Sequence, residues 1–392
     1  MKPYDVIVIG AGMIGLSTAY ELARMGAKVA LLERKRLGDS CSVSNTAMVF
    51  KADTEPDMGL ELTYESIRRF GQLSEELKYD IGYEEKDYIG LITNEKELEE
   101  AREQVSTFSA VGFDYRIADA KEIALREPHV NTDGTLGGLI CRQGRVDPFK
   151  FIYGYFLAAR RQGMDWFPDS KVVSISKAMH CVEVKTQKQV FHADKVVVAA
   201  GAWTREVVSL LGIELPQHYV HGEAIVTEAM PKLLDGIIGG VHSTRVDMEN
   251  EVTRLSEEKK WYGSDKLMEC REFVIHQVHE GNVLIGQRSF ARPFLYDRLS
   301  KDSFSSMVRE VLQFMPVLKN ASIIRSWSCP VPFTPDHRPF VGPLEEDGKI
   351  FVSSGYLSTI VLTPVMGEQV AKLVLNKKTD FNLDNFSPKR LL

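Results

Sequence analysis

The feature that most constrains the fold is a glycine pattern near the N-terminus, Gly10-Ala-Gly12-Met-Ile-Gly15, which directly follows the apolar run YDVIVI. In this spacing the first glycine permits a tight turn out of a strand, the second lets backbone approach a pyrophosphate, and the third allows a helix to pack closely on the strand. The N–H groups at the start of that helix favour phosphate binding. A second apolar run at residues 28–32 completes a βαβ unit, so the pattern predicts a dinucleotide-binding domain.

An acidic residue, Glu33, ends the second apolar run, 23 residues after Gly10. A carboxylate at this position accepts hydrogen bonds from ribose hydroxyls and repels a 2′-phosphate, which excludes NADP but leaves NAD and FAD open. Three features favour FAD. The motif lies at the very start of the sequence, a second strand at residues 193–203 ends in small residues, and no second GxGxxG follows. Electrons are therefore expected to come from the substrate rather than from NAD(P)H.

The length and charge of the chain narrow the remaining possibilities. At 392 residues it is too long for one ordinary core, so two domains are expected. A formal net charge of −6 argues against nucleic acid as a partner. No apolar stretch approaches about 18 residues and no signal-peptide pattern occurs, so we expect no transmembrane segment and a cytoplasmic location. Five widely spaced cysteines without a CxxC pair argue against a zinc ribbon or an iron–sulfur cluster, so no metal site is predicted.

Hydrophobic periodicity predicts helices and strands in two groups. Helices are predicted at residues 56–77, 95–105, 119–127, 147–161, 204–211, 302–314 and 363–375, and a second sheet at 219–227, 272–278 and 282–286. The predicted fold class is α/β (α+β), with a discontinuous Rossmann-like cofactor domain at 1–80, 146–215 and 325–392. A mixed, largely antiparallel sheet domain for substrate and subunit contacts is predicted at 81–145 and 216–324. Residues 245–271, of which 13 of 27 are charged, predict a helical excursion that is either a solvated face or a lid or subunit contact.

Further motifs occur in a specific order along the chain. They are Ser42-Val-Ser-Asn45-Thr46, Arg145-Val-Asp147-Pro148, residues 193–203, His221 to Glu228, Gly281 to Gly286, Arg325 to Trp327, Thr334-Pro-Asp336 and Pro339 to Pro343. With this order and spacing, the sequence resembles the D-amino acid oxidase superfamily of flavoproteins. The likeness is to the branch with glycine oxidase, monomeric sarcosine oxidase and the β subunits of heteromeric sarcosine oxidase and amino-acid dehydrogenases.

The resemblance implies a reaction and a set of cofactor contacts. The reaction is oxidation of the C–N bond of a small amino acid or secondary amine, of the glycine, sarcosine, D-amino acid or proline type, by hydride transfer to flavin N5. The imine formed then hydrolyses. The residues expected to contact FAD, including those of the dinucleotide motif, are Gly10, Gly12, Met13, Ile14, Gly15, Glu33, Arg34, Ser42, Asn45, Thr46, Val173, Ala200, Gly201, Trp203, Cys329, Gly342, Gly355, Ser358, Thr359 and Ile360.

Two segments depart from the family pattern. Val331 stands where glycine oxidase-like members hold the substrate carboxylate with an Arg, which favours the β-subunit branch. The C-terminal glycine-rich loop, Gly355 to Pro364, is one residue short and lacks two glycines. Ser358, Thr359 and Ile360 are therefore expected to add bulk at the pyrimidine end of the flavin.

Two further positions bear on the flavin chemistry. Cys329 lies where monomeric sarcosine oxidase-like members attach the flavin covalently, but a small buried thiol is the simpler reading, so non-covalent FAD is favoured. Leu284 stands at the strand position where those members use a Lys for oxygen activation. The resemblance therefore favours a dehydrogenase with a quinone or protein electron acceptor, and leaves open that the chain is a subunit of a heteromeric complex.

Four residues are candidates for substrate contact, and no catalytic base is identified. Lys51 and Arg288 carry charges that suit a substrate carboxylate, although a surface position is as compatible with either. His221 either faces the flavin or caps a strand. Tyr356 either lines the pocket or fills the core.

Two other functions stay open at this point. The same fold could oxidise a 2-hydroxy acid or glycerol phosphate, because a fold does not determine the substrate. A function of another class, a non-catalytic flavin-binding subunit that transfers electrons or scaffolds a complex, is favoured by the altered loop around residues 358–360.

Overall fold

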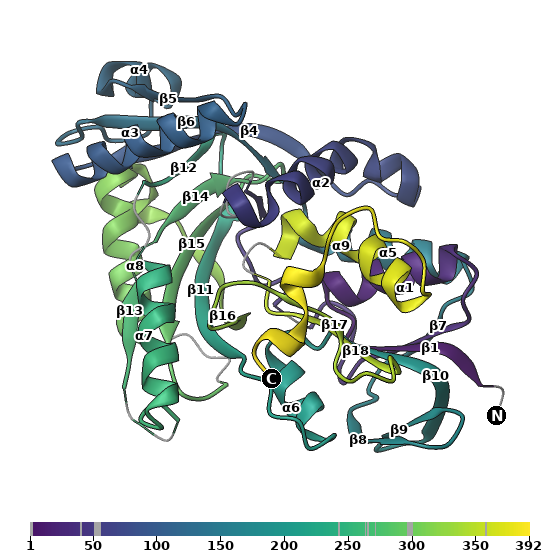
Figure 1. Ribbon diagram of the computed structural model, residues 1–392. Coiled ribbons are helices and arrows are strands. Elements are labelled where there is room, and N and C mark those ends of the chain that lie inside the picture. Colours follow the sequence, from purple (N-terminus) through teal and green to yellow (C-terminus); the bar gives the residue numbers. More distant parts are fainter. Residues whose placement is uncertain are drawn as a thin grey trace.

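Two sheets lie beside each other, and the chain passes from one to the other several times (Figure 1). The computed structural model describes residues 3–39, 41–50, 56–241, 244–262, 264, 266–270, 272–295, 301–356 and 359–392. The first sheet contains the predicted βαβ unit, formed by β1 (Tyr4–Ile9), α1 (Met13–Arg24) and β2 (Val29–Leu32). β1 lies inside this sheet because its apolar side chains are buried on both faces.

Among the described residues, the first sheet has eight strands, in the order β17-β18-β10-β1-β2-β7, with β9 paired to β10 and β8 paired to β9. β18, β10, β1, β2 and β7 run parallel, while β17 and β9 are antiparallel to their neighbours. Helices α1, α5 and α9 cover one face, and the β8–β9 hairpin and α6 cover the other. The bounds are β7 (Asp165–Phe167), β8 (Val172–Lys177), β9 (Val182–Thr186), β10 (Val190–Val198), β17 (Phe340–Pro343), β18 (Ile350–Ser354), α5 (Pro148–Arg161), α6 (Thr204–Ser209) and α9 (Thr359–Val374).

In the part of the chain that the structure describes, the second sheet has ten strands, in the order β16-β11-β15-β14-β12-β4-β6-β3, with β13 on β15 and β5 on β6. Its neighbours pair antiparallel except β12 and β4. This agrees with the predicted mixed, largely antiparallel sheet. The bounds are β3 (Met48–Val49), β4 (Glu84–Ile92), β5 (Tyr115–Ala118), β6 (Gly137–Arg145), β11 (His218–Ala229), β12 (Ile237–Gly240), β13 (Met268–Cys270), β14 (Val274–Gln277), β15 (Asn282–Ala291) and β16 (Ile323–Phe333).

Helices cover the second sheet unequally. Apolar side chains of α8 pack with one face of the sheet, and α3 packs near one end of the opposite face, beside β5 and β6 (Figure 1). The remaining face looks toward the first sheet and is left to form the wall of a cavity. The bounds of the helices outside the first sheet are α2 (Pro56–Leu77), α3 (Glu95–Ala110), α4 (Ala120–Arg126), α7 (Arg245–Glu257) and α8 (Lys301–Phe314).

Three sequence expectations differ from the observed elements. The predicted cofactor domain resumes at residue 325, but β16 pairs along its length with β11 and so belongs to the second sheet. The predicted excursion at 245–271 is helical only as α7, because residues 268–270 pair with β15 as β13. The last helix begins at Thr359 rather than 363, so Thr359 and Ile360 are helical residues instead of loop residues.

Within the described part of the chain, no helix has the length and apolar character needed to span a bilayer.

Candidate active site

A cavity of about 910 Å³ lies where the two sheets meet and takes its lining from both. This volume is near the upper end of the roughly 300–1,000 Å³ typical of small-molecule sites. Most of the predicted cofactor contacts, together with Tyr356, line it. They are Gly10, Gly12, Met13, Ile14, Glu33, Arg34, Ser42, Asn45, Thr46, Val173, Ala200, Gly201, Trp203, Cys329, Gly355, Tyr356, Thr359 and Ile360.

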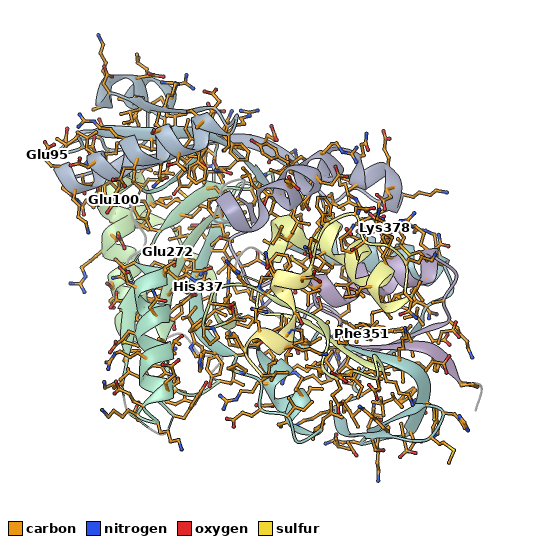
Figure 2. The ribbon with its side chains drawn as sticks, in the orientation of Figure 1. Glu95, Glu100, Glu272, His337, Phe351 and Lys378 are labelled. Carbon is orange, nitrogen blue, oxygen red and sulfur yellow. The ribbon has the colours of Figure 1, made fainter. Side chains whose placement is uncertain are left out.

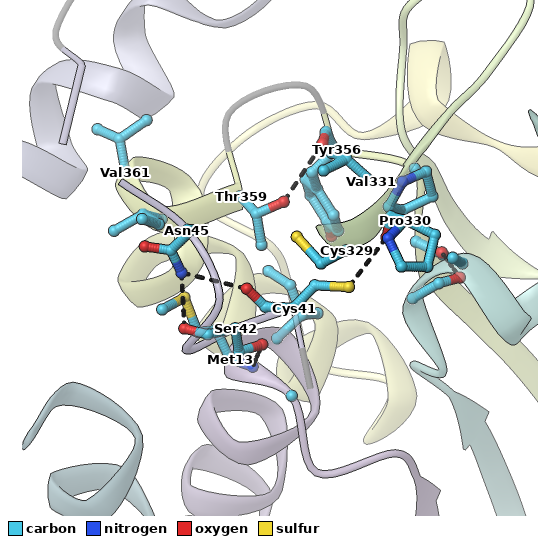
Figure 3. A pocket seen from close by; sticks show the side chains of 18 of the residues that line it. Met13, Cys41, Ser42, Asn45, Cys329, Pro330, Val331, Tyr356, Thr359 and Val361 are labelled. Atoms are coloured by element: carbon cyan, nitrogen blue, oxygen red, sulfur yellow. Dashed lines mark hydrogen bonds between the residues drawn. The ribbon is translucent and has the colours of Figure 1, made fainter. Parts of the chain in front are cut away.

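The N-terminus of α1 forms one wall of this cavity. Gly12 is its N-cap and supplies no side-chain cap, and the Met13 N–H donates to Ser42 Oγ at 3.0 Å (Figure 3). A Cβ on Gly15 would overlap the Gly10 carbonyl oxygen, and one on Gly10 would overlap the Ala199 carbonyl oxygen. Any larger residue would therefore push the helix off the strand. Backbone N–H groups and a helix dipole directed at the cavity suit a pyrophosphate.

The far end of β2 carries groups that suit a ribose and an adenine. The Glu33 carboxylate accepts hydrogen bonds from the backbone N–H groups of Ala11 and Lys35, each at 2.9 Å, which hold it at the cavity wall. The Arg34 guanidinium lies 3.6 Å from the centre of the Trp203 ring. Together with the half-exposed Val173, this pair offers a flat surface on which a planar base can lie.

A loop from the first sheet is held in place by a histidine of the second. His276 on β14 is buried, and burial lowers its pKa to about 4, so the ring is neutral near pH 7. Its Nε2–H donates to the Thr46 carbonyl oxygen at 3.0 Å. Next to Thr46, the Asn45 side chain donates to the Ser42 carbonyl at 2.8 Å and accepts from the Ala47 N–H at 2.7 Å. The predicted Ser42–Thr46 motif is thus a rigid corner of the cavity.

Two cysteines and a tyrosine lie around the N-terminus of α9 (Figure 3). The Cys41 thiol donates to the Pro330 carbonyl at 3.0 Å, and the Cys329 thiol donates to the Ser44 carbonyl at 2.8 Å. A hydrogen bond with Cys41 and burial raise the pKa of Cys329 well above its ordinary value. Tyr356 is buried with its hydroxyl 2.8 Å from Ser353 Oγ, so it lines the cavity as a fixed wall.

Other predicted site residues lie away from the cavity. Arg288 pairs with Glu310 at 2.7 Å and with Glu269, and the fully buried His221 lies inside β11 against Tyr219. Neither of them lines the cavity. Opposite Glu223 and Ala224, β15 carries one extra residue, Gln287, between Gly286 and Arg288. Gly342 lies near Pro388 instead, and Gly15 lies beneath the lining against Gly10. Lys51 and Ser358 lie outside the described residues.

Leu284 also does not line the cavity. The β15 side chain that does is Gln287, three residues further along. The comparison of Leu284 with an oxygen-activating lysine therefore used a strand position that does not reach the cavity.

Sequence reasoning missed an arginine that lines the cavity from the second sheet's side. Arg245 is the first residue of α7, and its Nε donates to Glu249 Oε1 at 2.8 Å. Glu249 is fully buried, and its other oxygen lies 3.1 Å from His337 Nδ1. Burial acts to raise the pKa of Glu249, but Arg245 and His337 outweigh it and hold that pKa below its ordinary value. The available signal was an Arg–Glu pair at i and i+4 directly after an apolar strand.

A missed carboxylate, Glu272, accompanies this arginine in the lining. Its Oε2 accepts hydrogen bonds from Ser289 Oγ at 2.7 Å and from Cys270 Sγ at 3.3 Å. Figure 2 shows Glu272 and His337 in the central part of the molecule. No sequence pattern singled out Glu272, because its role depends on the place where β14 begins.

The arrangement combines two functions in one cavity. Glycine backbone, a helix N-terminus and the Glu33 carboxylate at the end of β2 fit a dinucleotide on the side of the first sheet. One guanidinium and one carboxylate on the opposite side can hold a small molecule that carries both charges. The residues present therefore fit FAD together with an organic substrate.

Comparison with known proteins identifies the family. The sequence matches the family model for FAD dependent oxidoreductase (DAO) over residues 5–373. It is 27% identical to glycine oxidase of Geobacillus kaustophilus over 398 residues, which covers 99% of this chain and 97% of that protein. The crystal structure of glycine oxidase from Geobacillus kaustophilus superposes with a TM-score of 0.86 at 25% identity, covering 100% of both chains.

For two other relatives, the chain covers different shares of the relative's length. Mitochondrial dimethylglycine dehydrogenase of Rattus norvegicus is 25% identical over 397 residues, which is 98% of this chain but 44% of that protein. The chain thus spans less than half of that relative. A hydrogen cyanide synthase subunit of Pseudomonas protegens is 25% identical over 436 residues, covering 100% of this chain and 97% of that protein.

These matches confirm the resemblance that the motifs indicated, and with it the enzyme class and the dependence on FAD. The chain belongs to the DAO family of FAD-dependent oxidoreductases.

Proposed function

We propose that this chain oxidises the C–N bond of an α-amino acid or an N-alkyl amino acid by hydride transfer to bound FAD. The observation that carries the proposal is that Arg245 and Glu272 both line the cavity that contains the dinucleotide cradle. An amino acid carries a carboxylate and an amine on one carbon atom, and these two side chains complement both groups. When bound, FAD supplies the hydride acceptor.

Arg245 is the residue we assign to the substrate carboxylate. Its side chain is 13% exposed, and its Nε is committed to Glu249, so the guanidinium approaches the cavity in one orientation. Such a pre-oriented fork binds a carboxylate through charge-assisted hydrogen bonds. Val331, where the family pattern has an Arg, also lines the cavity. Arg245 on α7 therefore supplies the positive charge that is missing at position 331 of β16.

Glu272 is the residue we assign to the substrate amine. Its Oε2 already takes the hydrogen bonds from Ser289 and Cys270, so Oε1 is the acceptor for the amine N–H. A carboxylate there holds an ammonium group and can receive its proton, which frees the nitrogen lone pair before the C–H bond is broken. Cys329, Pro330 and Val331 line the same cavity, and their apolar side chains would limit the access of water to the reaction.

We propose that FAD is held without a covalent bond to Cys329. The thiolate is the nucleophilic form of cysteine, and both the raised pKa and the hydrogen bond to Ser44 favour the protonated thiol. After acid precipitation we expect the yellow colour in the supernatant. Colour retained on the protein would instead identify a covalent link.

We further propose that the enzyme is a dehydrogenase that passes electrons to a quinone or a protein partner. The β15 side chain in the cavity, Gln287, is a neutral amide, which offers no positive charge to stabilise reduced oxygen. A relative described as a synthase subunit supports a heteromeric assembly. Turnover should reduce an artificial quinone much faster than it forms hydrogen peroxide, and stoichiometric peroxide would contradict the proposal.

The main test is anaerobic bleaching of the bound flavin. Holoenzyme would be mixed with D- and L-amino acids, N-methyl amino acids, proline, 2-hydroxy acids and glycerol 3-phosphate, and the flavin absorbance near 450 nm, roughly where oxidised flavins absorb, would be followed. Bleaching by amino or N-alkyl amino acids supports the proposal. If only hydroxy acids or glycerol phosphate bleach the flavin, the chain oxidises those substrates instead. If no compound bleaches it, a non-catalytic subunit is favoured.

A further inference from the structure

The cavity continues beyond the Arg245 region into a pocket under α3, which we call the side chamber. Residues of β4, α3, β5, β6 and the end of β12 form its walls. They are Tyr88, Phe108, Tyr115, Leu139, Cys141 and Val241, together with the amides Gln104 and Gln143. The dinucleotide cradle is built on the first sheet, whereas the side chamber lies on the second, so the cofactor does not account for it.

The side chamber is mostly apolar, and its polar side chains form hydrogen bonds within the protein. The Gln104 amide donates to the Val241 carbonyl at 3.3 Å. The Tyr88 hydroxyl donates to the Gly240 carbonyl at 2.8 Å, and Gln143 donates to the Tyr115 hydroxyl at 3.2 Å. The Phe108 and Tyr115 rings lie 5.0 Å apart between centres. Among the described residues of these walls none carries a charge. A charged or strongly polar group would lose its hydration here without gaining a partner.

Chain connectivity places the side chamber close to the reacting centre. Val241 in its wall and Arg245 are four residues apart, which a chain spans over at most about 14 Å. Thr46, at the corner held by His276, and Phe50 are also four residues apart, and the Phe50 ring packs edge-on against Tyr88 at 5.9 Å. One small molecule can therefore contact Arg245 with its carboxylate and reach the side chamber with a substituent.

We infer that the substrate carries a bulky, uncharged, apolar or aromatic substituent that occupies the side chamber while Arg245 holds the carboxylate. This inference rests on the proposed function and names its substrate class. Glycine and sarcosine have no side chain at the α-carbon and would leave the side chamber empty. Each methylene that moves from water into contact with apolar walls makes binding more favourable, so affinity rises with the size of the substituent until the space is full.

Binding of unreactive carboxylates to the holoenzyme tests the inference without turnover. Isothermal titration calorimetry would compare acetate, butyrate, hexanoate and 3-phenylpropionate at the same pH and salt. We expect a gain of about fourfold in affinity per methylene, the value of one buried CH₂. Equal affinities along the series would overturn the inference.

Two matched variants test whether the gain in affinity arises in the side chamber. Cys141→Phe fills the side chamber from β6, and Cys181→Phe makes the same change beside β9, outside the cavity lining. We expect Cys141→Phe to weaken hexanoate and 3-phenylpropionate at least tenfold more than acetate, and Cys181→Phe to keep the wild-type series. An unchanged series in Cys141→Phe would overturn the inference.

A third variant covers the case in which Cys141→Phe fails to bind FAD or to fold. Phe108 is only partly buried on α3, so Phe108→Ala enlarges the side chamber with little damage to the core. The carboxylate that binds Phe108→Ala most tightly should be longer than the one that binds wild type most tightly. The same preferred length in both would overturn the inference.

Flavin bleaching distinguishes this result from the outcome for the proposed function. If glycine or alanine bleaches the flavin best, C–N oxidation is supported but the bulky substituent is excluded. If affinity rises with carboxylate length but no amino acid bleaches the flavin, the oxidation reaction is excluded and an apolar carboxylate-binding site is supported.

Discussion

The two ends of the cavity are built from different parts of the chain. The dinucleotide end consists mainly of backbone from two short segments, residues 9–14 and 41–46, and from the ends of β2 and β10. The substrate end consists of side chains from segments far apart in the sequence, including Arg245 on α7, Glu272 before β14 and Val331 on β16. A site made of local backbone tolerates few residues other than glycine, whereas a site made of distant side chains can change its specificity one residue at a time.

The strongest way to break the dinucleotide end is to add one carbon atom. In Gly15→Ala the new Cβ would overlap the Gly10 carbonyl oxygen, so α1 must move away from β1. We expect loss of FAD binding and a large fall in stability, measured as the ratio of flavin to protein absorbance and the melting temperature. Gly71→Ala on α2 is the control because nothing lies within 4 Å of its added Cβ; it should stabilise the helix by about 0.5–1 kcal/mol. Stoichiometric FAD in Gly15→Ala would show that close helix–strand contact is dispensable.

At the substrate end the largest effect is expected from Arg245→Met. Removing one partner of an enclosed charged hydrogen bond costs about 2–5 kcal/mol, so kcat/KM for flavin reduction should fall roughly 30-fold or more. Arg245→Lys should recover part of this loss, since it restores the charge but not the fork. Arg325→Met on the exposed part of β16 is the matched control. If Arg245→Met retains wild-type kinetics, the carboxylate is held elsewhere, and Lys51→Met becomes the next variant to measure.

A smaller effect is expected when the support of Arg245 is removed. Glu249→Gln keeps the size of the side chain but loses the charge that orients the guanidinium. We expect about a tenfold rise in KM, equivalent to about 1.4 kcal/mol, with little change in the limiting rate of flavin reduction. The lowered pKa of Glu249 means that its contribution to stability is complete above its unfolded pKa and is lost as the pH falls through the folded pKa. Equal losses in KM and in the limiting rate would argue against a role in positioning alone.

The buried His276 ring, which donates to the Thr46 carbonyl, should make the stability of the protein depend on pH. The pKa of His276 is lowered to about 4, so the unfolded chain binds a proton at this ring between about pH 6.5 and 4 while the folded chain does not. Stability should therefore fall with decreasing pH in this window, by on the order of 1 kcal/mol per pH unit for this ring. Urea unfolding of wild type and His276→Gln at several pH values measures the difference in slope. The exposed His129→Gln should keep the wild-type slope, and an unchanged slope in His276→Gln would exclude the ring as the source.

Sequence patterns predicted the first sheet and its motif better than the second. The βαβ unit, the α5 boundary with Asp147 as N-cap, and α2 at residues 56–77 agree with the structure, because each depends on residues close together in the chain. Arg288, His221 and Leu284 were placed by the resemblance to the family, position by position along the strands. β15 has an extra residue, Gln287, opposite Glu223 and Ala224, and Gln287 rather than Leu284 or Arg288 lines the cavity. No local pattern reveals such a bulge.

The sequence by itself therefore determined the dinucleotide-binding βαβ unit, since the glycine spacing and the acidic residue after the second strand are requirements of a local backbone geometry. Only the tertiary structure brought Arg245, Glu272 and the side chamber to one cavity. These residues meet through the pairing of strands that are far apart in sequence and through the buried ion pair that turns Arg245 inward. The position of a side chain in such a site depends on sheet register, which long-range packing sets.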